Sequence, residues 1–496
     1  MFSLKNLLYL KERFPHGVKR QKKKTMIPPK KYTLPLSLIV LSLYGALGQI
    51  ALGSDAAQPP NIIFVFTDDQ PLRGMGHIDP FFHTPNMDRL ADEGVSFVNA
   101  FVESSICAVS RASTLMGQYN SRHGIQSFDR ALTPEQMEQS FPGILREAGY
   151  RTAFMGKFGV GHPRAEPLEL CLPEDSFDLW YGFPHAPSYS QKVGGETRYM
   201  TSVIEEKTIQ FIEETPRDQP FMAYLCLPEP HGQGGAGGPW NYRDPAFEMP
   251  EPSALPERPE TMQVEAFRKL PESIRKSKNV HISTRPDESY IQYMNTVRDY
   301  IGRSDLAIGR IREALEKEGR ADNTVIIFAS DNGSMWGAKG MAGKWNMYEE
   351  SIRIPMIVFD PRLPASLGGE KREQMALNID LTVSVLDFAG LPIPDRMQGK
   401  SLVPLLTHPN RHLRDDFYYL HDVYSRSGGA PLPRLEGVRT ENHKYIRYIG
   451  SDPLEEELFD LRSDPLEEVN LIDNPDYASL LRKLRNRTDE LRGQVK

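Results

Sequence analysis

The sequence predicts an α/β protein with a large mixed, mostly parallel sheet that carries helices on both faces, followed by a small antiparallel sheet. The first observation is four short runs that are apolar throughout and end in polar residues, at 61–66, 151–155, 220–227 and 324–329. Strands covered on both faces read as continuous apolar runs, whereas half-exposed strands alternate. The second observation is helical segments between these runs, and the third is a change of pattern after residue 405.

Two segments between the apolar runs have the signals of helices. Residues 84–94, TPNMDRLADEG, begin with a Thr-Pro pair and stop at Gly94. Residues 297–319 place apolar side chains at helical spacing, namely Ile301, Leu306, Ile308, Ile311 and Leu315. Between residues 232 and 290 the sequence is rich in glycine, proline and mixed charge, which predicts a long surface insertion.

The carboxyl-terminal part has a different character. Residues 416–424, 435–450 and 455–464 are typical of short, half-exposed strands, and a charged helix is expected from about Asp476. We therefore predict three parts: a basic region with a signal peptide over 1–53, a main α/β domain over 54–405, and an antiparallel subdomain with a final helix over 406–496.

The amino terminus has the order of a secretory signal. The basic run KRQKKK at 19–24 precedes an apolar stretch and small residues near Gly53, and Met26 is an alternative start. A membrane anchor is the less favoured reading, because Pro35, Gly45 and Gly48 interrupt the apolar stretch. We expect a secreted or periplasmic protein without a stable membrane partner. In that compartment Cys171 and Cys226 could pair, and the spacing leaves this open.

The bulk composition excludes one class of partner. The net charge of −7 is modest for 496 residues, the basic residues are scattered, and no nucleic-acid-binding motif is present. With 39% hydrophobic residues the chain can bury a large core. The composition therefore favours a globular protein that does not bind nucleic acid.

Polar side chains follow each of the four predicted strands. Asp68 and Asp69 follow the first, Lys157 the second, His231 the third, and Asp331 with Asn332 the fourth. In open α/β sheets ligands bind beyond the carboxyl ends of the strands, so we expect these groups to share one crevice. Carboxylate and amide oxygens suit calcium or magnesium better than zinc. A single such pair is usually a solvated turn, whereas two pairs behind buried strands favour a metal site.

Cys107 stands in SSICAVSRASTLMGQ, at the predicted start of a helix. Backbone N–H groups at a helix amino terminus favour an anion, so a nucleophile or an anion-binding group belongs there. The alternative is a buried cysteine that acts as a small hydrophobic residue. His123, downstream on the same stretch, is interpreted as a packing or hydrogen-bonding group, and Trp336, Trp345 and Tyr348 as core aromatics.

At this point the residues resemble a known family. CAVSR at 107–111 resembles the sulfatase signature C-x-P-S-R, and ASTLMGQYNSRHG continues that pattern. The resemblance extends from about residue 60 to residue 475, and the order and spacing of its segments agree with the family. They include PNIIFVFTDDQ, TPNMDRLADEGVSFVNAF, GYRTAFMGK, PFMAYLCLPEPHG, NTVIIFASDNG, GKWNMYEESIRIPMIV, KYIRYI and ELFDLRSDPLEEVNL.

The resemblance implies an alkaline-phosphatase-like fold and hydrolysis of sulfate esters, with a sulfated carbohydrate as substrate. It implies that a formylglycine-generating enzyme oxidises Cys107 to formylglycine, whose hydrate attacks sulfur with one hydroxyl and later expels sulfate by restoring the carbonyl. One calcium ion would be held by Asp68, Asp69, residue 107, Asp331 and Asn332. Arg111 would hold the diol, Lys157 and Lys344 the sulfate oxygens, and His231 would protonate the departing alcohol.

Two positions depart from the family pattern. Val109 replaces the usual proline, which bears on recognition by the maturing enzyme, and Gly159 replaces a histidine of the common G-K-W-H stretch. His162 is a hypothetical substitute for that histidine. These departures keep two alternatives open. One is a phosphate or phosphonate ester hydrolase of the same superfamily, and the other is a catalytically silent protein that binds sulfated glycans.

Overall fold

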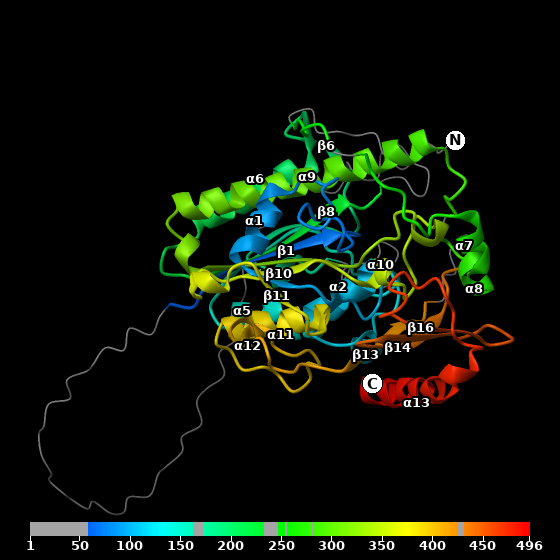
Figure 1. The fold of residues 1–496 in the computed structure, drawn as a ribbon. Helices are drawn as coiled ribbons and strands as arrows, with labels where there is room; N and C mark the ends of the chain where they lie inside the picture. Colours follow the sequence, from blue (N-terminus) through cyan, green and yellow to red (C-terminus); the bar gives the residue numbers. More distant parts are fainter. Residues whose placement is uncertain (1–57, 162–171, 233–246, 253–254, 280, 424–430) are drawn as a thin grey trace, which may run out of the picture. The chain divides into compact units, whose positions relative to one another are not determined.

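The computed structural model describes residues 58–161, 172–232, 247–252, 255–279, 281–423 and 431–496. Its centre is an eight-stranded sheet in the order β11-β2-β10-β9-β1-β8-β4-β5 (Figure 1). β1 (Asn61–Asp68), β8 (Phe221–Pro230), β9 (Thr324–Ser330), β4 (Arg151–Lys157) and β5 (Leu179–Phe183) run parallel. β10 (Met356–Phe359) is antiparallel to β9 and to β2 (Val95–Phe97), while β11 (Glu370–Arg372) is parallel to β2. The predicted mixed, mostly parallel sheet is confirmed.

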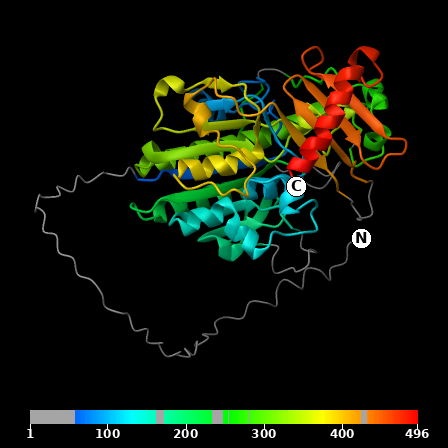
Figure 2. The same ribbon diagram turned by 90° about the horizontal axis from the view of Figure 1, so that it is seen from below.

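Helices cover both faces of this sheet, which explains the continuous apolar runs. Along β1, Ile62, Phe64 and Phe66 belong to one buried cluster, and Ile63 and Val65 belong to another. The first face packs against α2 (Cys107–Met116), α5 (Phe141–Glu147) and α11 (Asn378–Phe388). The second packs against α1 (Pro85–Glu93), α6 (Met200–Glu214) and α9 (Asp287–Lys317), and Figures 1 and 2 show these two layers.

The predicted helices differ from the structure mainly at their ends. α1 begins at Pro85 and ends before Gly94, as expected. α9 begins at Asp287, well before the predicted Val297, because buried Tyr290 and Met294 extend its apolar face toward the amino end. Where the structure describes the expected insertion over 232–290, it shows α7 (Val264–Lys269), α8 (Glu272–Arg275) and the start of α9.

A separate four-stranded antiparallel sheet follows, in the order β13 (Asp416–His421), β14 (Leu435–Thr440), β15 (His443–Tyr448) and β16 (Glu455–Asp460). The final helix, α13 (Ala478–Gln494), lies across this sheet and buries Leu481, Leu484 and Leu491 (Figure 2). The antiparallel sheet and final helix are confirmed, while the domain boundaries at 53 and 405 stay predictions.

The remaining elements are short. They are β3 (Ala100–Phe101), α3 (Asn120–His123), α4 (Pro134–Gln139), η3 (Glu174–Ser176), β6 (Ser190–Val193), β7 (Glu196–Tyr199), η4 (Ala321–Asn323), η5 (Ala338–Gly340), α10 (Glu349–Ile352), η6 (Ala365–Leu367), β12 (Ala376–Leu377), α12 (Val403–Thr407) and η7 (Pro475–Tyr477).

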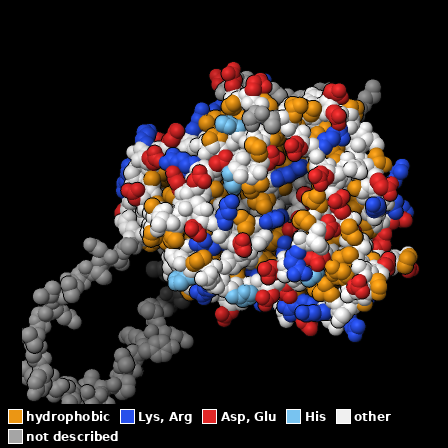
Figure 3. Space-filling view, viewed as in Figure 1, with side chains coloured by type: hydrophobic (Ala, Val, Ile, Leu, Met, Phe, Trp, Pro, Cys, Tyr) orange, Lys and Arg blue, Asp and Glu red, His pale blue; other side chains and the backbone are white. Residues whose placement is uncertain are grey.

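Some of the sequence predictions fall outside the described residues. These are the signal segment at 1–53, His162 and Cys171, whereas Cys226 is buried in β8. Among the described residues, the helices are too short or too polar to cross a membrane. On the face shown in Figure 3, acidic and basic side chains are interspersed rather than gathered by sign.

Candidate active site

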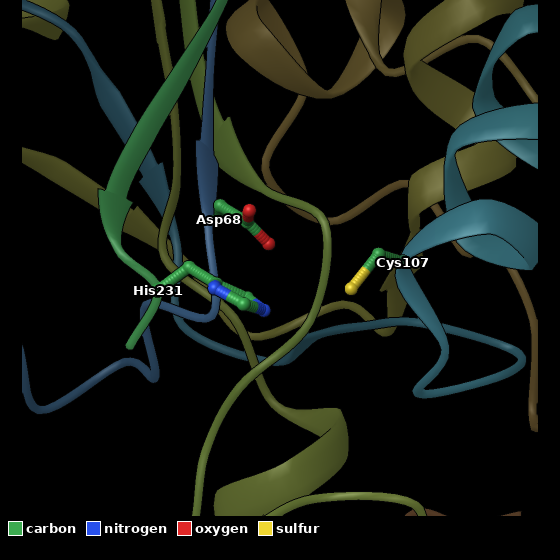
Figure 4. Close-up of side chains that lie close together, drawn as sticks. All are labelled: Asp68, Cys107 and His231. Carbon is green, nitrogen blue, oxygen red and sulfur yellow. The ribbon is translucent and has the colours of Figure 1, made fainter. Parts of the chain in front are cut away.

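The carboxyl ends of four parallel strands bring distant residues to one place. Thr67 is in register with Ser330, Asp68 with Pro230, and Gly156 with Cys226. The residues that end or follow these strands therefore meet at the same edge of the sheet. Figure 4 shows Asp68 on β1, His231 just after β8 and Cys107 at the start of α2, with their side chains close together.

Cys107 is the first residue of α2, as the sequence predicted, and its side chain is buried. Its Sγ atom lies 2.7 Å from Lys344 Nζ and 3.9 Å from Asp69 Oδ1. Burial raises the pKa of the thiol to about 12, and the nearby charges of Lys157 and Lys344 do not reverse this. An unmodified Cys107 is therefore a neutral thiol near pH 7, which is a poor nucleophile.

Acidic oxygens surround this sulfur. One ligand atom from each of Asp68, Asp69, Cys107 and Asp331 lies within 4.8 Å of the others. The Asp68 Oδ1 atom is buried and accepts no hydrogen bond from the residues that the structure describes. Asp69 holds a left-handed backbone with φ of 70°, which is uncommon for aspartate and typical of functional sites. This donor set fits a hard divalent cation.

Asp68, the last residue of β1, and Asp69, which follows it, are ionised despite their burial. Burial alone would raise the pKa of Asp68, but the positive charges of Lys157 and His231 outweigh it and lower that pKa. Burial likewise acts to raise the pKa of Asp69, and Lys344 with His231 lower it. Two like charges side by side need such cations, or a metal ion, to remain ionised.

Arg111 is buried beneath the site, with 1% of its surface exposed. Its Nε atom donates to Asp331 Oδ2 at 2.9 Å, and its Nη1 atom donates to the carbonyl oxygen of Lys157 at 2.8 Å. The guanidinium also lies over the Phe66 ring, 5.5 Å from its centre. Arg111 therefore connects α2 with the ends of β4 and β9.

Two buried lysines contact the acidic cluster. Lys157 Nζ donates to Asp68 Oδ2 at 2.5 Å. Lys344 Nζ donates to Asp69 Oδ1 and lies 3.3 Å from Asn332 Oδ1. The amide nitrogen of Asn332 donates in turn to Asp69 Oδ1 at 2.8 Å. Both lysines therefore direct positive charge at residue 107 and its carboxylates.

His231 lies at the more open side of the site, with a side chain 33% exposed. Its Nε2 atom is 4.0 Å from Asp69 Oδ2. The hydroxyl of Tyr189 donates toward the carbonyl oxygens of His231, at 2.8 Å, and Pro228, at 3.1 Å. Sequence reasoning missed Tyr189, because no local pattern indicates a contact made across some forty residues.

The structure shows what surrounds Val109 and gives a physical reason for Gly159. Val109 is fully buried and packs in a cluster with Ile106, Val423 and Leu432. Gly159 has φ of 73°, and a Cβ atom there would lie 2.8 Å from Arg111 Cδ. A side chain at position 159 would thus be strained and would press on Arg111. The suggested substitute, His162, lies outside the described residues.

A second polar group lies behind α2. His123 is buried and accepts a hydrogen bond at Nδ1 from the backbone N–H of Ile125, so its Nε2–H donates to Ser113 Oγ, 2.8 Å away. Ser113 donates to Glu103, a buried carboxylate that sequence reasoning missed. The interpretation of His123 as a hydrogen-bonding group is confirmed. Trp336 and Tyr348 are buried core residues, as expected, while Trp345 is half-buried.

This sheet and this cluster of acidic oxygens and cations around a cysteine define a hydrolase of the alkaline phosphatase superfamily. The sulfatase family profile matches residues 60–391, and a profile described as N-sulphoglucosamine sulphohydrolase, C-terminal, matches residues 337–494. Because the first match covers more than half of the chain, the chain belongs to the sulfatase family. It is a sulfuric ester hydrolase.

Three similar proteins are informative. The N-acetylglucosamine-6-O-sulfatase of Bacteroides thetaiotaomicron is 29% identical over 530 residues, covering 94% of this chain and 91% of the relative. A structure solved with its substrate D-glucosamine-2-N,6-O-disulfate has a TM-score of 0.68 and 26% identity, covering 88% of this chain and 98% of that one. The phosphonate monoester hydrolase of Agrobacterium radiobacter shares the fold, with a TM-score of 0.69, 22% identity, and 88% and 96% coverage.

Proposed function

We propose that this sulfatase hydrolyses sulfate esters of an amino sugar, with a formylglycine derived from Cys107 and one calcium ion. The observation that carries the proposal is the convergence of Cys107, three aspartates, two lysines and an arginine at the carboxyl edge of the sheet. A neutral thiol in this position has little use as a nucleophile, whereas a hydrated aldehyde there would supply an oxygen nucleophile.

The calcium ion would be held by Asp68, Asp69, Asp331 and Asn332, together with residue 107. The Oδ1 of Asp68, which accepts no hydrogen bond from the described residues, and the hard oxygen donors support this assignment. When bound, the ion would stabilise negative charge on the oxygens of residue 107 and of the sulfate group.

Four side chains would position the reacting groups, stabilise negative charge and transfer a proton. Arg111 is fixed by Asp331 and would hold the oxygens of residue 107 in place. Lys157 and Lys344 would neutralise the charge that grows on the sulfuryl oxygens in the transition state. His231 is the most exposed of these groups and would donate a proton to the oxygen of the departing alcohol as a general acid.

The substrate proposal rests on the relatives. One is named as an N-acetylglucosamine-6-O-sulfatase, and another was solved with a disulfated glucosamine. We infer a sulfated glucosamine-type sugar, with the sulfate at the 6-oxygen as the first position to test. Figure 4 shows the His231 ring directed toward Cys107 beside Asp68, so His231 would be within reach of an alcohol that leaves a sulfuryl group held at residue 107.

The test combines chemistry and mass spectrometry. Protein from the native host is digested, and the peptide around Cys107 is weighed; the expected product is an aldehyde in place of the thiol. The same protein is assayed on glucosamine 6-sulfate, on glucosamine N-sulfate and on a phosphonate monoester. Hydrolysis of the 6-sulfate with an aldehyde at residue 107 supports the proposal. A persistent thiol together with faster phosphonate hydrolysis would overturn it in favour of the phosphonate hydrolase alternative.

Maturation and location complete the proposal. A formylglycine-generating enzyme would act on the CAVSR segment despite Val109, before that residue is buried in α2. The basic and apolar segment within residues 1–53 would direct secretion, or export to the periplasm. Residues 54–405 would form the catalytic domain and residues 406–496 the antiparallel subdomain.

A further inference from the structure

A group of buried charges joins the antiparallel sheet to the active-site domain. Lys444 on β15 is 0% exposed, and its Nζ atom lies 2.8 Å from Glu349 Oε1 and 2.6 Å from Glu467 Oε1. Arg439 on β14 also pairs with Glu349, at 3.3 Å. Glu467 accepts a hydrogen bond at 2.8 Å from the backbone N–H of Glu349. We call these four residues the C-terminal ionic cluster.

Lys339 and Tyr348, which precede Glu349 in the chain, make two further contacts with the carboxyl-terminal part. Lys339 Nζ donates to the carbonyl oxygens of Leu466, at 2.9 Å, and Glu467. The hydroxyl of Tyr348 contacts both carboxylate oxygens of Glu457 on β16, at 2.9 and 3.0 Å. Segment 339–349 is therefore tied at its start to the loop that follows β16 and at its end to β15 and β16 of the antiparallel sheet.

Lys344 stands in the middle of this segment. Its Nζ atom lies 2.7 Å from Cys107 Sγ and also contacts Asp69. Backbone strain occurs on both sides of this lysine, because Lys339 and Trp345 have φ of 52° and 70°. Residues in this region of φ persist only where the surrounding structure holds them.

We propose that the C-terminal ionic cluster positions Lys344. The antiparallel sheet would thereby contribute to catalysis in the active site. The proposal rests on the proposed function, since it takes Lys344 to act on the sulfuryl oxygens. Lys444, Glu349 and Glu467 are positioning residues, because they act through Lys344 and do not touch residue 107.

The chemistry of the cluster favours this role over simple stabilisation. A buried ion pair is often no more stabilising than a well-packed apolar group, because both charges lose their water. Directional charge pairs and hydrogen bonds can instead hold a segment of backbone in a single conformation. Here they hold the segment that carries Lys344. A lysine aimed at a transferring group must be placed closely, since small displacements cost large factors in rate.

The experiment compares two cations that stand three positions apart on β15. Lys444→Met removes the cation that faces segment 339–349. Arg447→Met is the matched control, because Arg447 is 14% exposed and pairs with Glu436 and Asp489, away from that segment. We expect both variants to lower Tm. We expect Lys444→Met to lower kcat tenfold or more with a smaller change in KM, and Arg447→Met to leave kcat within about twofold.

A double-mutant cycle with Lys344→Met tests the route of the effect. If the cluster acts through Lys344, Lys444→Met lowers kcat no further in the Lys344→Met background. Additive losses, or an unchanged kcat in the folded Lys444→Met protein, would overturn the proposal. Should Lys444→Met fail to fold, Tyr348→Phe takes its place. It removes one hydroxyl, Glu457 keeps its hydrogen bond from Tyr448 at 2.6 Å, and a threefold or greater loss of kcat is expected.

Binding of inorganic sulfate separates this proposal from the proposed function. Stabilisation by sulfate depends on the lysines whether or not turnover occurs, and it is measured as a rise in Tm. If the wild-type protein hydrolyses no sulfate ester, the proposed function fails by itself. The positioning role is then judged by whether Lys444→Met weakens sulfate binding tenfold while Arg447→Met does not.

Discussion

The Nζ atom of Lys344 lies 2.7 Å from the sulfur of Cys107, although the two residues are 237 positions apart in the sequence. Cys107 begins the helix that follows β3, and Lys344 stands in a loop that follows β9. β3 lies outside the eight-stranded sheet, so the contact forms because the start of α2 packs at the edge where β1 and β9 end.

Replacing Lys344 should damage catalysis more than folding. We expect Lys344→Met to lower kcat for sulfate-ester hydrolysis by roughly 10²–10³-fold, since a buried cation aimed at the reacting group is lost. Lys371→Met is the control, because Lys371 is exposed on β11. Steady-state kinetics and a thermal melt of both variants check this. Equal kcat values for the two variants would remove Lys344 from the proposed machinery.

Calcium should stabilise the protein through the acidic cluster. We expect the Tm of chelator-treated protein to rise with added calcium, by an amount worth about 2.7 kcal/mol at a hundredfold excess over Kd. The Asp69→Asn variant should lose most of this rise, whereas Asp415→Asn, with a side chain 90% exposed, should keep it. Differential scanning calorimetry at several calcium concentrations measures the effect. A calcium-independent Tm in the wild type would count against the metal assignment.

Gly159 should not tolerate a side chain. Both Gly159 and Gly149 have positive φ, but a Cβ at position 149 meets nothing within 4 Å, while one at 159 lies 2.8 Å from Arg111 Cδ. Gly149→Ala should therefore lower the free energy of unfolding only by the cost of a left-handed backbone at alanine, about 1–2 kcal/mol. Gly159→Ala should lower the free energy of unfolding, measured by chemical denaturation, by more than Gly149→Ala does. It should also lower kcat at least tenfold, because it displaces Arg111. Equal stability and equal activity of the two variants would contradict this.

Acid should destabilise the protein through His421. This histidine is fully buried on β13, its Nδ1–H donates to the carbonyl oxygen of Pro433, and burial lowers its pKa from 6.5 to about 4. Between these values the unfolded chain binds a proton that the folded protein does not. The stability that neutral His421 allows is thus fully present above pH 6.5. As the pH falls toward 4, the free energy of unfolding decreases by about 3 kcal/mol.

The variant His421→Asn tests this source of acid sensitivity, because asparagine keeps a donor near Pro433 but does not titrate. Its free energy of unfolding should fall by about 3 kcal/mol less than that of the wild type between pH 7 and pH 4. His412→Asn serves as the comparison, since His412 has a side chain 67% exposed. Urea titrations across this pH range give the values, and parallel curves for wild type and His421→Asn would refute the assignment.

The strands and the chemistry of the site were predictable because both leave local signals. An apolar run such as 61–66 is covered on both faces, and a polar pair such as Asp68 and Asp69 follows it. The start of α9 was predicted too late, because its first turn, with Tyr290, falls within the stretch 232–290 whose composition predicted a surface insertion.

The sequence by itself determined the α/β architecture, the strand-end position of the candidate ligands and the membership in a hydrolase family, because burial pattern and motif spacing are properties of neighbouring residues. Only the tertiary structure decided that Arg111 lies where a side chain at 159 would be, that Tyr189 holds the backbone at His231, and that Lys444 is joined to the segment of Lys344. These contacts join residues distant in the chain, and side-chain burial and directional hydrogen bonds are set only when the elements have packed.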